Sequence, residues 1–135
     1  MSIDFPYEKK YIEEGFLIDP RVNVEIKTNR GFLVVKFLLD SGADVTTLPI
    51  NPYLELFDFR INKKDKVKIG GVEGRGVNAY PLGLECKINQ INFKLRCYLI
   101  QSNIDPLLGR LDFWTIFSIN FDNLKLKTSL HSLKK

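Results

Sequence analysis

Short apolar segments separated by turn residues make up most of this chain. Apolar residues occupy alternate positions from Val22 to Ile26, which is the period of a half-buried strand. Asn-Arg-Gly at 29–31 supplies a turn, and an apolar, β-branched run follows from Phe32 to Leu39. These two runs predict a β-hairpin. Alternation on both sides of Asn89-Gln90, over residues 84–88 and 91–99, predicts a second hairpin.

Between the hairpins, residues 45–48 predict a short strand that ends at Pro49. Residues 66–80 read as two alternating arms around a glycine-rich tip. After a turn at Asp105-Pro106, the segment Leu-Asp-Phe-Trp-Thr-Ile-Phe at 111–117 is the one good helix candidate. We expect its aromatic residues to lie in the core: Phe113, Trp114 and Phe117.

A strand at 119–121, a turn at 122–123 and a terminal strand that carries Leu124 and Leu126 complete the prediction. Many short strands with one late helix indicate an all-β fold, a small closed β-barrel. We assign residues 21–128 to this domain. Residues 1–20 match no recognisable pattern, and residues 129–135 are expected to form a frayed tail.

Composition places the chain among ordinary globular proteins. Its 44% hydrophobic and 27% charged residues fit neither a disordered nor a fibrous protein. No apolar run is long enough to cross a bilayer and the N-terminus lacks a signal-like apolar region, so we expect a cytoplasmic protein without a membrane partner. A net charge of +4 is too weak a basic bias to indicate nucleic-acid binding. Cys86 and Cys97 are expected to be buried thiols, with a bridge between paired strands as the alternative.

Several kinds of catalytic site are excluded by the residues that the chain lacks. The single histidine, His131, lies in the expected tail, so a Ser or Cys nucleophile has no imidazole base. Two thiols eleven positions apart match no zinc spacing, and the glycines near residue 70 do not connect a strand to a helix. We therefore expect neither a metal nor another cofactor. Catalysis by side-chain carboxylates is the class of chemistry that is not excluded.

The candidate carboxylate is Asp40, which directly follows the apolar strand and begins the segment Asp-Ser-Gly-Ala-Asp. An acid at this point leaves the core where the chain turns, and Gly42 permits a tight turn there. Taken alone, Asp-Ser-Gly is also a common turn after any strand.

The run Phe-Leu-Leu-Asp-Ser-Gly-Ala-Asp-Val-Thr-Thr-Leu-Pro resembles the active-site signature of the retroviral-type (retropepsin-like) aspartic proteases. Two further segments match that family in the right order. Residues 68–74 resemble its glycine-rich flap, and Pro-Leu-Leu-Gly-Arg at 106–110 resembles the segment before its single helix. The resemblance covers roughly residues 20–126 and implies an acid-protease barrel with a flap hairpin and one short C-terminal helix.

The resemblance also implies roles for individual residues. Asp40 corresponds to the catalytic aspartate, and Ser41 to the residue that links the active-site loops of two subunits by hydrogen bonds. Gly42 corresponds to a position whose carbonyl accepts a hydrogen bond from the substrate backbone. Asp44 corresponds to an acid that holds the substrate main chain, and Arg110 to the arginine that pairs with it. A solvated charge pair is the alternative for these two. The flap residues that cover substrate would be Gly70, Gly71 and Val72.

The chain departs from the family pattern in two places. Leu111 rather than an acid or amide follows Gly-Arg, with Asp112 one position later, which leaves the start of the helix open by one residue. Glu73 and Arg75 put charge at or near a flap tip that is usually small and apolar.

A single Asp-Ser-Gly implies two chains. Aspartic-protease chemistry needs two carboxylates that share one proton, and this chain is about half as long as a two-lobed enzyme would be. We therefore expect a homodimer that pairs Asp40 with Asp40 of its mate and cleaves extended polypeptide substrates. The alternative is a catalytically inactive, dimeric peptide-binding module of the same fold. A nucleic-acid-binding barrel is disfavoured, because no face combines basic and aromatic residues.

Overall fold

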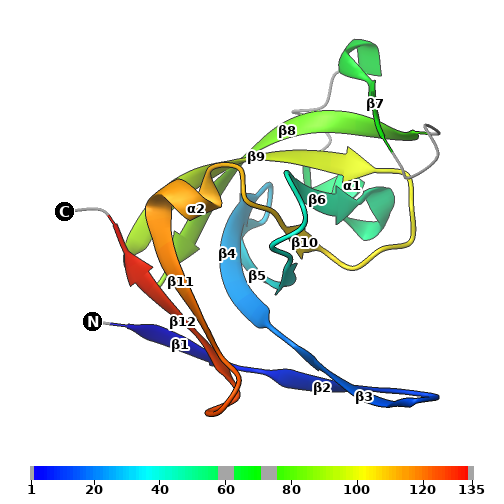
Figure 1. Cartoon of the computed structure of the whole chain (residues 1–135). Helices are drawn as coiled ribbons and strands as arrows, with labels where there is room; N and C mark the ends of the chain where they lie inside the picture. Colours follow the sequence, from blue (N-terminus) through cyan, green and yellow to red (C-terminus); the bar gives the residue numbers. More distant parts are fainter. Residues whose placement is uncertain (1, 58–62, 71–75, 134–135) are drawn as a thin grey trace.

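The two predicted hairpins form most of the wall of a closed barrel (Figure 1). The computed structural model describes residues 2–57, 63–70 and 76–133. Strands β4 (Arg21–Thr28) and β5 (Gly31–Leu39) pair antiparallel, as do β8 (Val77–Ile88) and β9 (Ile91–Ile100). Both hairpins were predicted from the alternation of apolar residues, and both predictions are confirmed.

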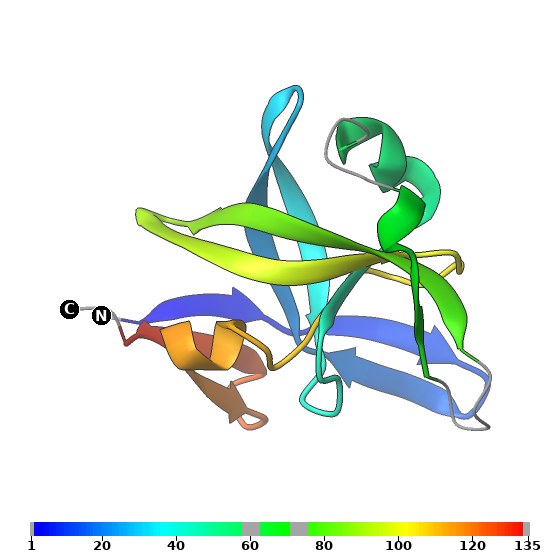
Figure 2. The same cartoon turned by 90° about the horizontal axis from the view of Figure 1, so that it is seen from above.

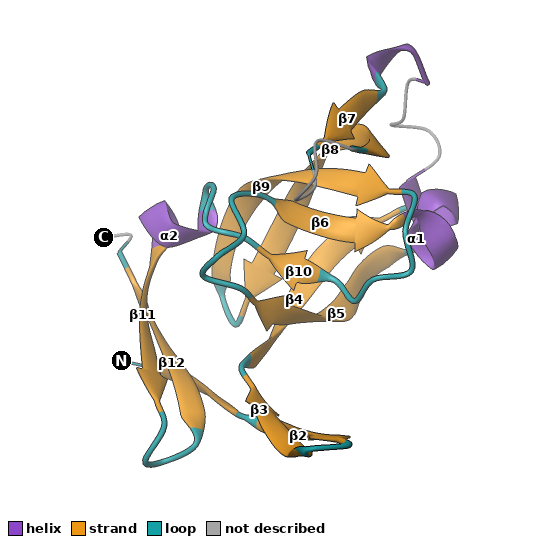
Figure 3. Ribbon diagram, turned by 45° about the vertical axis from the view of Figure 1, so that its right-hand side comes forward, coloured by secondary structure: helices purple, strands orange, loops and turns teal. Residues whose placement is uncertain are grey.

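Two short strands complete the barrel. Strand β6 (Thr46–Pro49) pairs parallel with β9 of the second hairpin. Strand β10 (Leu107–Leu108) lies between β6 and β5 and pairs with both of them. Pairing of β4 with β8 then closes a ring of six strands in the order β4-β5-β10-β6-β9-β8 (Figure 3). The predicted all-β closed barrel is therefore correct.

The barrel interior is a continuous apolar core supplied by alternate residues of these strands. Its largest fully buried side chains come from both hairpins, the short strands β6 and β10, both α-helices and the C-terminal strands: Phe37, Phe57, Phe113, Phe117, Ile26, Leu48, Leu84, Leu95, Leu99, Leu108, Leu130 and Val22. Cys86 and Cys97 are buried free thiols, as expected. Burial raises the pKa of Cys86 to about 12 and also raises the pKa of Cys97, so both remain protonated and unreactive at neutral pH.

Helix α1 (Ile50–Phe57) was not predicted. Asn51 precedes a proline, which disfavours helical backbone angles, and it has φ −97° and ψ 127°. The helical turns follow from Pro52, because proline fits the first position of a helix. Phe57 is fully buried in the core, and this tertiary contact explains a helix that the local sequence does not indicate.

The predicted late helix is confirmed as α2 (Phe113–Ile116), but it is shorter than expected. Phe113 and Phe117 are buried, and the ring centroids of both lie 6.0 and 5.3 Å from that of Phe93. The prediction of a buried Trp114 is wrong, since this residue is 41% exposed. Phe113 in the helical turn and Phe117, which directly follows it, are the buried aromatic residues of this segment.

Residues 127–132 form a strand. Strand β12 (Lys127–Ser132) lies between β1 (Ile3–Pro6) and β11 (Phe117–Asp122), and its Ser129 and Leu130 are buried. The expected frayed tail at 129–135 is thus wrong for residues 129–132, because strands on both sides hold them. His131, expected in that tail, is an exposed residue of β12.

The terminal strand also begins later than predicted. Leu124 and Leu126 belong to the turn between β11 and β12, and Leu124 is 92% exposed. The carboxylate of Asp122 accepts the N–H groups of Leu124 and Lys125 at 3.1 and 2.9 Å. This turn delays the start of the strand.

Residues 1–20, which matched no pattern, supply β1 and a separate hairpin of β2 (Glu8–Ile12) and β3 (Gly15–Asp19). This hairpin projects away from the barrel (Figures 2 and 3). The remaining elements are the short helix η2 (Lys63–Asp65) and strand β7 (Val67–Ile69). Within the described ranges, no helix has the length and apolar character needed to span a membrane.

Candidate active site

Asp40 stands at the end of β5, where backbone hydrogen bonds hold the chain on both sides. Leu39 donates its N–H to the carbonyl of Pro20 at 2.9 Å, and Asp40 donates its own to the carbonyl of Leu108 at 3.1 Å. The first partner precedes β4, and the second belongs to β10. The strand that carries the acid is therefore fixed up to the residue itself.

The turn after β5 fixes the carboxylate as well as the backbone. Ala43 donates to the carbonyl of Asp40 at 3.1 Å, and the N–H of Gly42 donates to Oδ1 of Asp40 at 2.9 Å. A Cβ at Gly42 would lie 3.3 Å from the same Oδ1, a tight contact that favours glycine. Asp40 is half-buried, whereas Ser41 and Gly42 are exposed. One carboxylate oxygen is thus bound to its own turn.

Asp44 and Arg110 form an ion pair, although they are 66 residues apart in the sequence. Two backbone hydrogen bonds align the segments that carry these side chains. The N–H of Arg110 donates to the carbonyl of Ala43 at 3.0 Å, and the N–H of Leu111 donates to the carbonyl of Asp44 at 2.9 Å. The side chains are 81% and 48% exposed. Because water screens such a pair, it contributes at most about 1 kcal/mol to stability, and its main effect is to orient Asp44.

Gly109 and Thr46 connect the two site segments; both lie in motifs quoted from the sequence, but no role was predicted for Thr46. Gly109 donates its N–H to the buried hydroxyl oxygen of Thr46 at 3.1 Å. A Cβ at Gly109 would lie 2.3 Å from the carbonyl oxygen of Val45. The sequence signal that we missed is a Thr-Thr pair inside an otherwise apolar strand.

This threonine pair allows a matched prediction. Thr46→Val should destabilise the protein by about 1–3 kcal/mol, because it leaves the buried N–H of Gly109 without its acceptor. Thr47→Val should be neutral or slightly stabilising, since the buried hydroxyl of Thr47 has no hydrogen-bond partner. Urea denaturation of both variants measures the difference. Equal losses of stability would show that the Thr46 bond is unimportant.

The predicted flap is present as far as it is described. Strand β7 pairs with the start of β8, with Ile69 opposite Val77. This pairing confirms the two arms read from residues 66–80. Gly70 is exposed at the end of one arm, while Gly71 and Val72 lie outside the described residues, as do Glu73 and Arg75.

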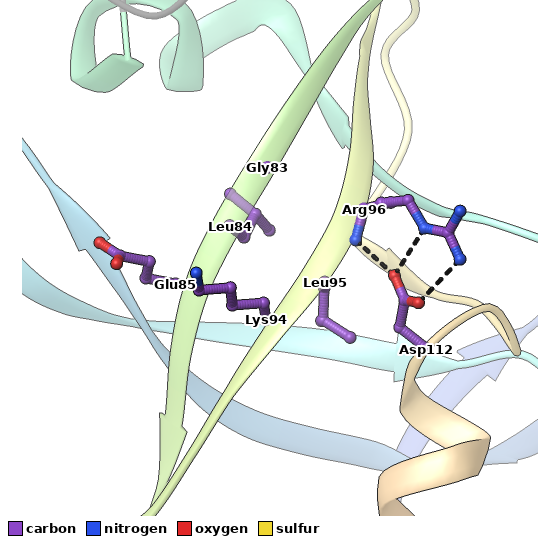
Figure 4. A pocket seen from close by; sticks show the side chains of 7 residues that line it. All are labelled: Gly83, Leu84, Glu85, Lys94, Leu95, Arg96 and Asp112. Carbon is purple, nitrogen blue, oxygen red and sulfur yellow. Dashed lines mark hydrogen bonds and ion pairs between the residues drawn. The ribbon is translucent and has the colours of Figure 1, made fainter.

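Asp112 directly precedes α2, so the helix begins at Phe113. Asp112 accepts hydrogen bonds from the backbone N–H of Arg96 at 2.8 Å and from its guanidinium at 3.2 and 3.0 Å (Figure 4). Both residues line a shallow pocket on β8 and β9 that contains none of the described site residues named above. Asp112 has φ 69° and ψ −48°, and the N–H of Phe113 donates to the carbonyl of Leu111 at 2.8 Å, so Asp112 is the central residue of a γ-turn.

The Arg96 guanidinium holds the pKa of Asp112 below its ordinary value, so the folded state favours the carboxylate. Asp112→Asn keeps the backbone preference but removes the charge, and it should lower Tm at neutral pH by up to about 4 °C. Because the pKa of Asp112 is lower in the folded state, its carboxylate stabilises the fold at pH values above the ordinary carboxyl pKa of about 3.9. This stabilisation is lost as the pH falls through the pKa of the folded state. The difference in Tm should therefore shrink in acid. A difference that is constant with pH would contradict the electrostatic cause.

Comparison with known proteins identifies the fold. Similar solved structures include the EIAV protease complexed with the inhibitor HBY-793, at 26% identity over 75% of this chain and 88% of that chain, with a TM-score of 0.52. A retropepsin-like aspartic protease from Rickettsia conorii matches at 18% identity over 96% and 90%, with a TM-score of 0.61. The retroviral protease-like domain of Ddi1 from Leishmania major matches at 16% identity over 86% and 94%, with a TM-score of 0.57.

Neither a protein-family model nor a curated protein matches the sequence. The structural matches nevertheless cover most of this chain and of each neighbour. The chain therefore has the fold of the retroviral and retropepsin-like aspartic proteases, and the predicted fold is confirmed.

Proposed function

We propose that the chain is a member of the retropepsin-like family and one subunit of a homodimeric aspartic endopeptidase. The observation that supports this most strongly is the geometry of Asp40. Its half-buried carboxylate follows a barrel strand, is bound by the N–H of Gly42, and stands on a backbone held from both sides. The Gly42 bond is that of an Asx-turn; the backbone bonds of Leu39 and Asp40 to Pro20 and Leu108 in addition fix the acid relative to β4 and β10.

The single Asp40 is the reason for proposing a dimer. Two carboxylates close together share one proton, so that one acts as base while the other acts as acid. A two-fold axis beside Asp40 supplies the second carboxylate from an identical chain. Ser41 is exposed next to it and would hydrogen-bond across the axis.

In this mechanism the ionised member of the Asp40 pair takes a proton from water as the oxygen attacks the scissile carbonyl. The protonated member donates to the developing oxyanion, which gives a tetrahedral diol. The protonated carboxyl then gives its proton to the leaving nitrogen, while the other carboxylate takes a proton from a hydroxyl of the diol as the C=O bond re-forms and the C–N bond breaks. The dyad ends with one shared proton, as it began.

Substrate would lie extended between the active-site turn and the flap, with strand-like main-chain hydrogen bonds. The carbonyl of Gly42 would accept one of these bonds, and Asp44, oriented by Arg110, would hold the substrate backbone. Gly70, Gly71 and Val72 would cover the peptide. Each of these roles comes from the family resemblance.

Cleavage of a peptide library between about pH 4 and 7 tests the proposal, since a carboxylate dyad works best in mild acid. We expect endoproteolysis that a statine-type peptide, a mimic of the diol, inhibits. The competing function is an inactive peptide-binding module, for which the charged flap residues Glu73 and Arg75 leave room. Such a module would bind peptides or the statine without cleaving any library member.

A further inference from the structure

The outer face of the sheet next to Asp40 carries two neighbouring leucines. Leu38 precedes Asp40 by two residues, so the alternation along the strand places their side chains on the same face. The register pairs Leu38 of β5 with Leu107 of β10, and both side chains are half-buried (Figure 3). The next residue of each strand, Leu39 and Leu108, is buried in the core. Leu38 and Leu107 therefore form a small apolar surface beside the candidate catalytic carboxylate.

A charged cluster borders this apolar surface. Arg21 of β4 stands opposite Leu38 in the strand register. Its Nη2 donates to Oδ2 of Asp19 at 3.0 Å and to Oδ2 of Asp105 at 3.1 Å. The Arg21 and Asp19 side chains are each 15% exposed, whereas that of Asp105 is 58% exposed. Asp105 is therefore the member of the cluster that can contact a ligand.

Backbone hydrogen bonds fix Asp105 relative to Asp40. The carbonyl of Pro106 accepts the N–H of Leu38 at 2.9 Å, and the carbonyl of Leu108 accepts the N–H of Asp40 at 3.1 Å. Asp105 directly precedes Pro106, and a residue before proline has a restricted backbone. The exposed acid and the candidate catalytic acid are thus carried by neighbouring strands in a fixed register.

The charged cluster has an excess of negative charge. Two carboxylates share the single guanidinium of Arg21. Lys36, two residues before Leu38, does not compensate this excess, because it pairs with Glu8 at 3.0 Å. Water screens the exposed carboxylate of Asp105, but a ligand that covers the surface would displace this water and strengthen the attraction for a positive charge.

We infer that this surface is a subsite for a lysine or arginine side chain of the substrate, and that Asp105 determines this specificity. The apolar stem of such a side chain would pack on Leu38 and Leu107, and its charged end would donate to the Asp105 carboxylate. A glutamate or aspartate at the same position would be repelled.

This inference rests on the proposed function, because it requires a peptide that passes Asp40 in an extended conformation. The two-fold axis of the proposed dimer repeats the subsite. A basic residue would therefore be accepted on either side of the scissile bond.

Asp105→Asn tests the subsite. The amide has nearly the same size and can still accept a hydrogen bond from Arg21, but it lacks the negative charge. The substrates are peptides that differ only in lysine, norleucine or glutamate at the residue next to the scissile bond. For the wild type we expect kcat/KM to be at least about tenfold higher with lysine than with glutamate. The ratio of lysine to norleucine should fall about tenfold in Asp105→Asn, because a hydrogen bond between two charged groups is lost. A purely structural role would change both peptides by the same factor and leave this ratio constant.

Asp65→Asn is the matched control, since it removes one exposed carboxylate from η2. It should leave the ratios of the wild type unchanged. Non-cleavable statine-type peptides with lysine or norleucine at the same position give a measurement that does not depend on catalysis. Isothermal titration calorimetry should show a lower Kd for the lysine peptide in the wild type and a loss of this difference in Asp105→Asn.

The two measurements separate the subsite from the peptidase. Cleavage without a preference for lysine over glutamate, or with a lysine to norleucine ratio that Asp105→Asn does not change, would overturn the subsite but leave the peptidase. Selective binding of the lysine statine that Asp105→Asn removes, without cleavage of any peptide, would overturn the peptidase but leave the subsite. Absence of both binding and cleavage would overturn both.

Discussion

Asp40→Asn should lower kcat/KM for peptide cleavage by at least about a thousandfold. The amide has nearly the same shape as the carboxylate, but it can neither take a proton from water nor share one with its mate. In a homodimer the substitution removes both catalytic groups at once. Steady-state hydrolysis of a peptide found in the library screen, between about pH 4 and 7, gives the ratio.

The fold should survive this change. The Asn side-chain oxygen can still accept the N–H of Gly42, which the carboxylate accepts at 2.9 Å. Urea denaturation should therefore show a midpoint close to that of wild type. Asp65→Asn, at the exposed end of η2, is the control for loss of one carboxylate elsewhere and should retain activity. Undiminished cleavage by purified Asp40→Asn would end the proposed mechanism.

Gly109→Ala should destabilise the protein by about 3 kcal/mol and abolish activity even where the barrel persists. The new Cβ would lie 2.3 Å from the carbonyl oxygen of Val45 and 2.8 Å from its nitrogen. Both are backbone atoms, so no side-chain rotation relieves the overlap, and the strands have to separate. Movement of Val45 displaces Asp44 and weakens the bond from Gly109 to Thr46.

Gly83→Ala is the matched control. A Cβ at Gly83 meets no atom within 4 Å, and this glycine lies in the regular strand β8. Its effect on the free energy of unfolding should stay within about 1 kcal/mol. Urea unfolding of both variants measures stability, and peptide hydrolysis measures activity. Equal stabilities for the two variants would show that the close approach at Gly109 relaxes without cost.

Local pattern was sufficient for the barrel and for the position of the acid. Alternation of apolar residues predicts β4, β5, β8 and β9 because one face of each strand is buried. Asp40 follows an apolar strand directly, so its place at the strand end could be read from the sequence. The ion pair of Asp44 with Arg110 was expected only from the resemblance, since nothing local joins residues 66 positions apart.

The wrong predictions have local causes in some places and distant partners in others. Leu124 and Leu126 alternate with lysines like a strand, but the carboxylate of Asp122 binds the backbone into a turn there. Residues 129–132 look like a polar tail, yet strands from both ends of the chain pair with them. Trp114 has a core-like side chain, but Phe113 in the short helix and Phe117 at the start of β11 are the aromatic residues buried there.

The alternation of apolar residues was enough to predict the all-β barrel and the strand that Asp40 follows, because the burial of alternate side chains is a local property of each strand. The tertiary structure was needed to show that Gly109 donates to Thr46 and that strands from both ends of the chain share one sheet. These two features join residues far apart in the sequence, so no local pattern predicts them.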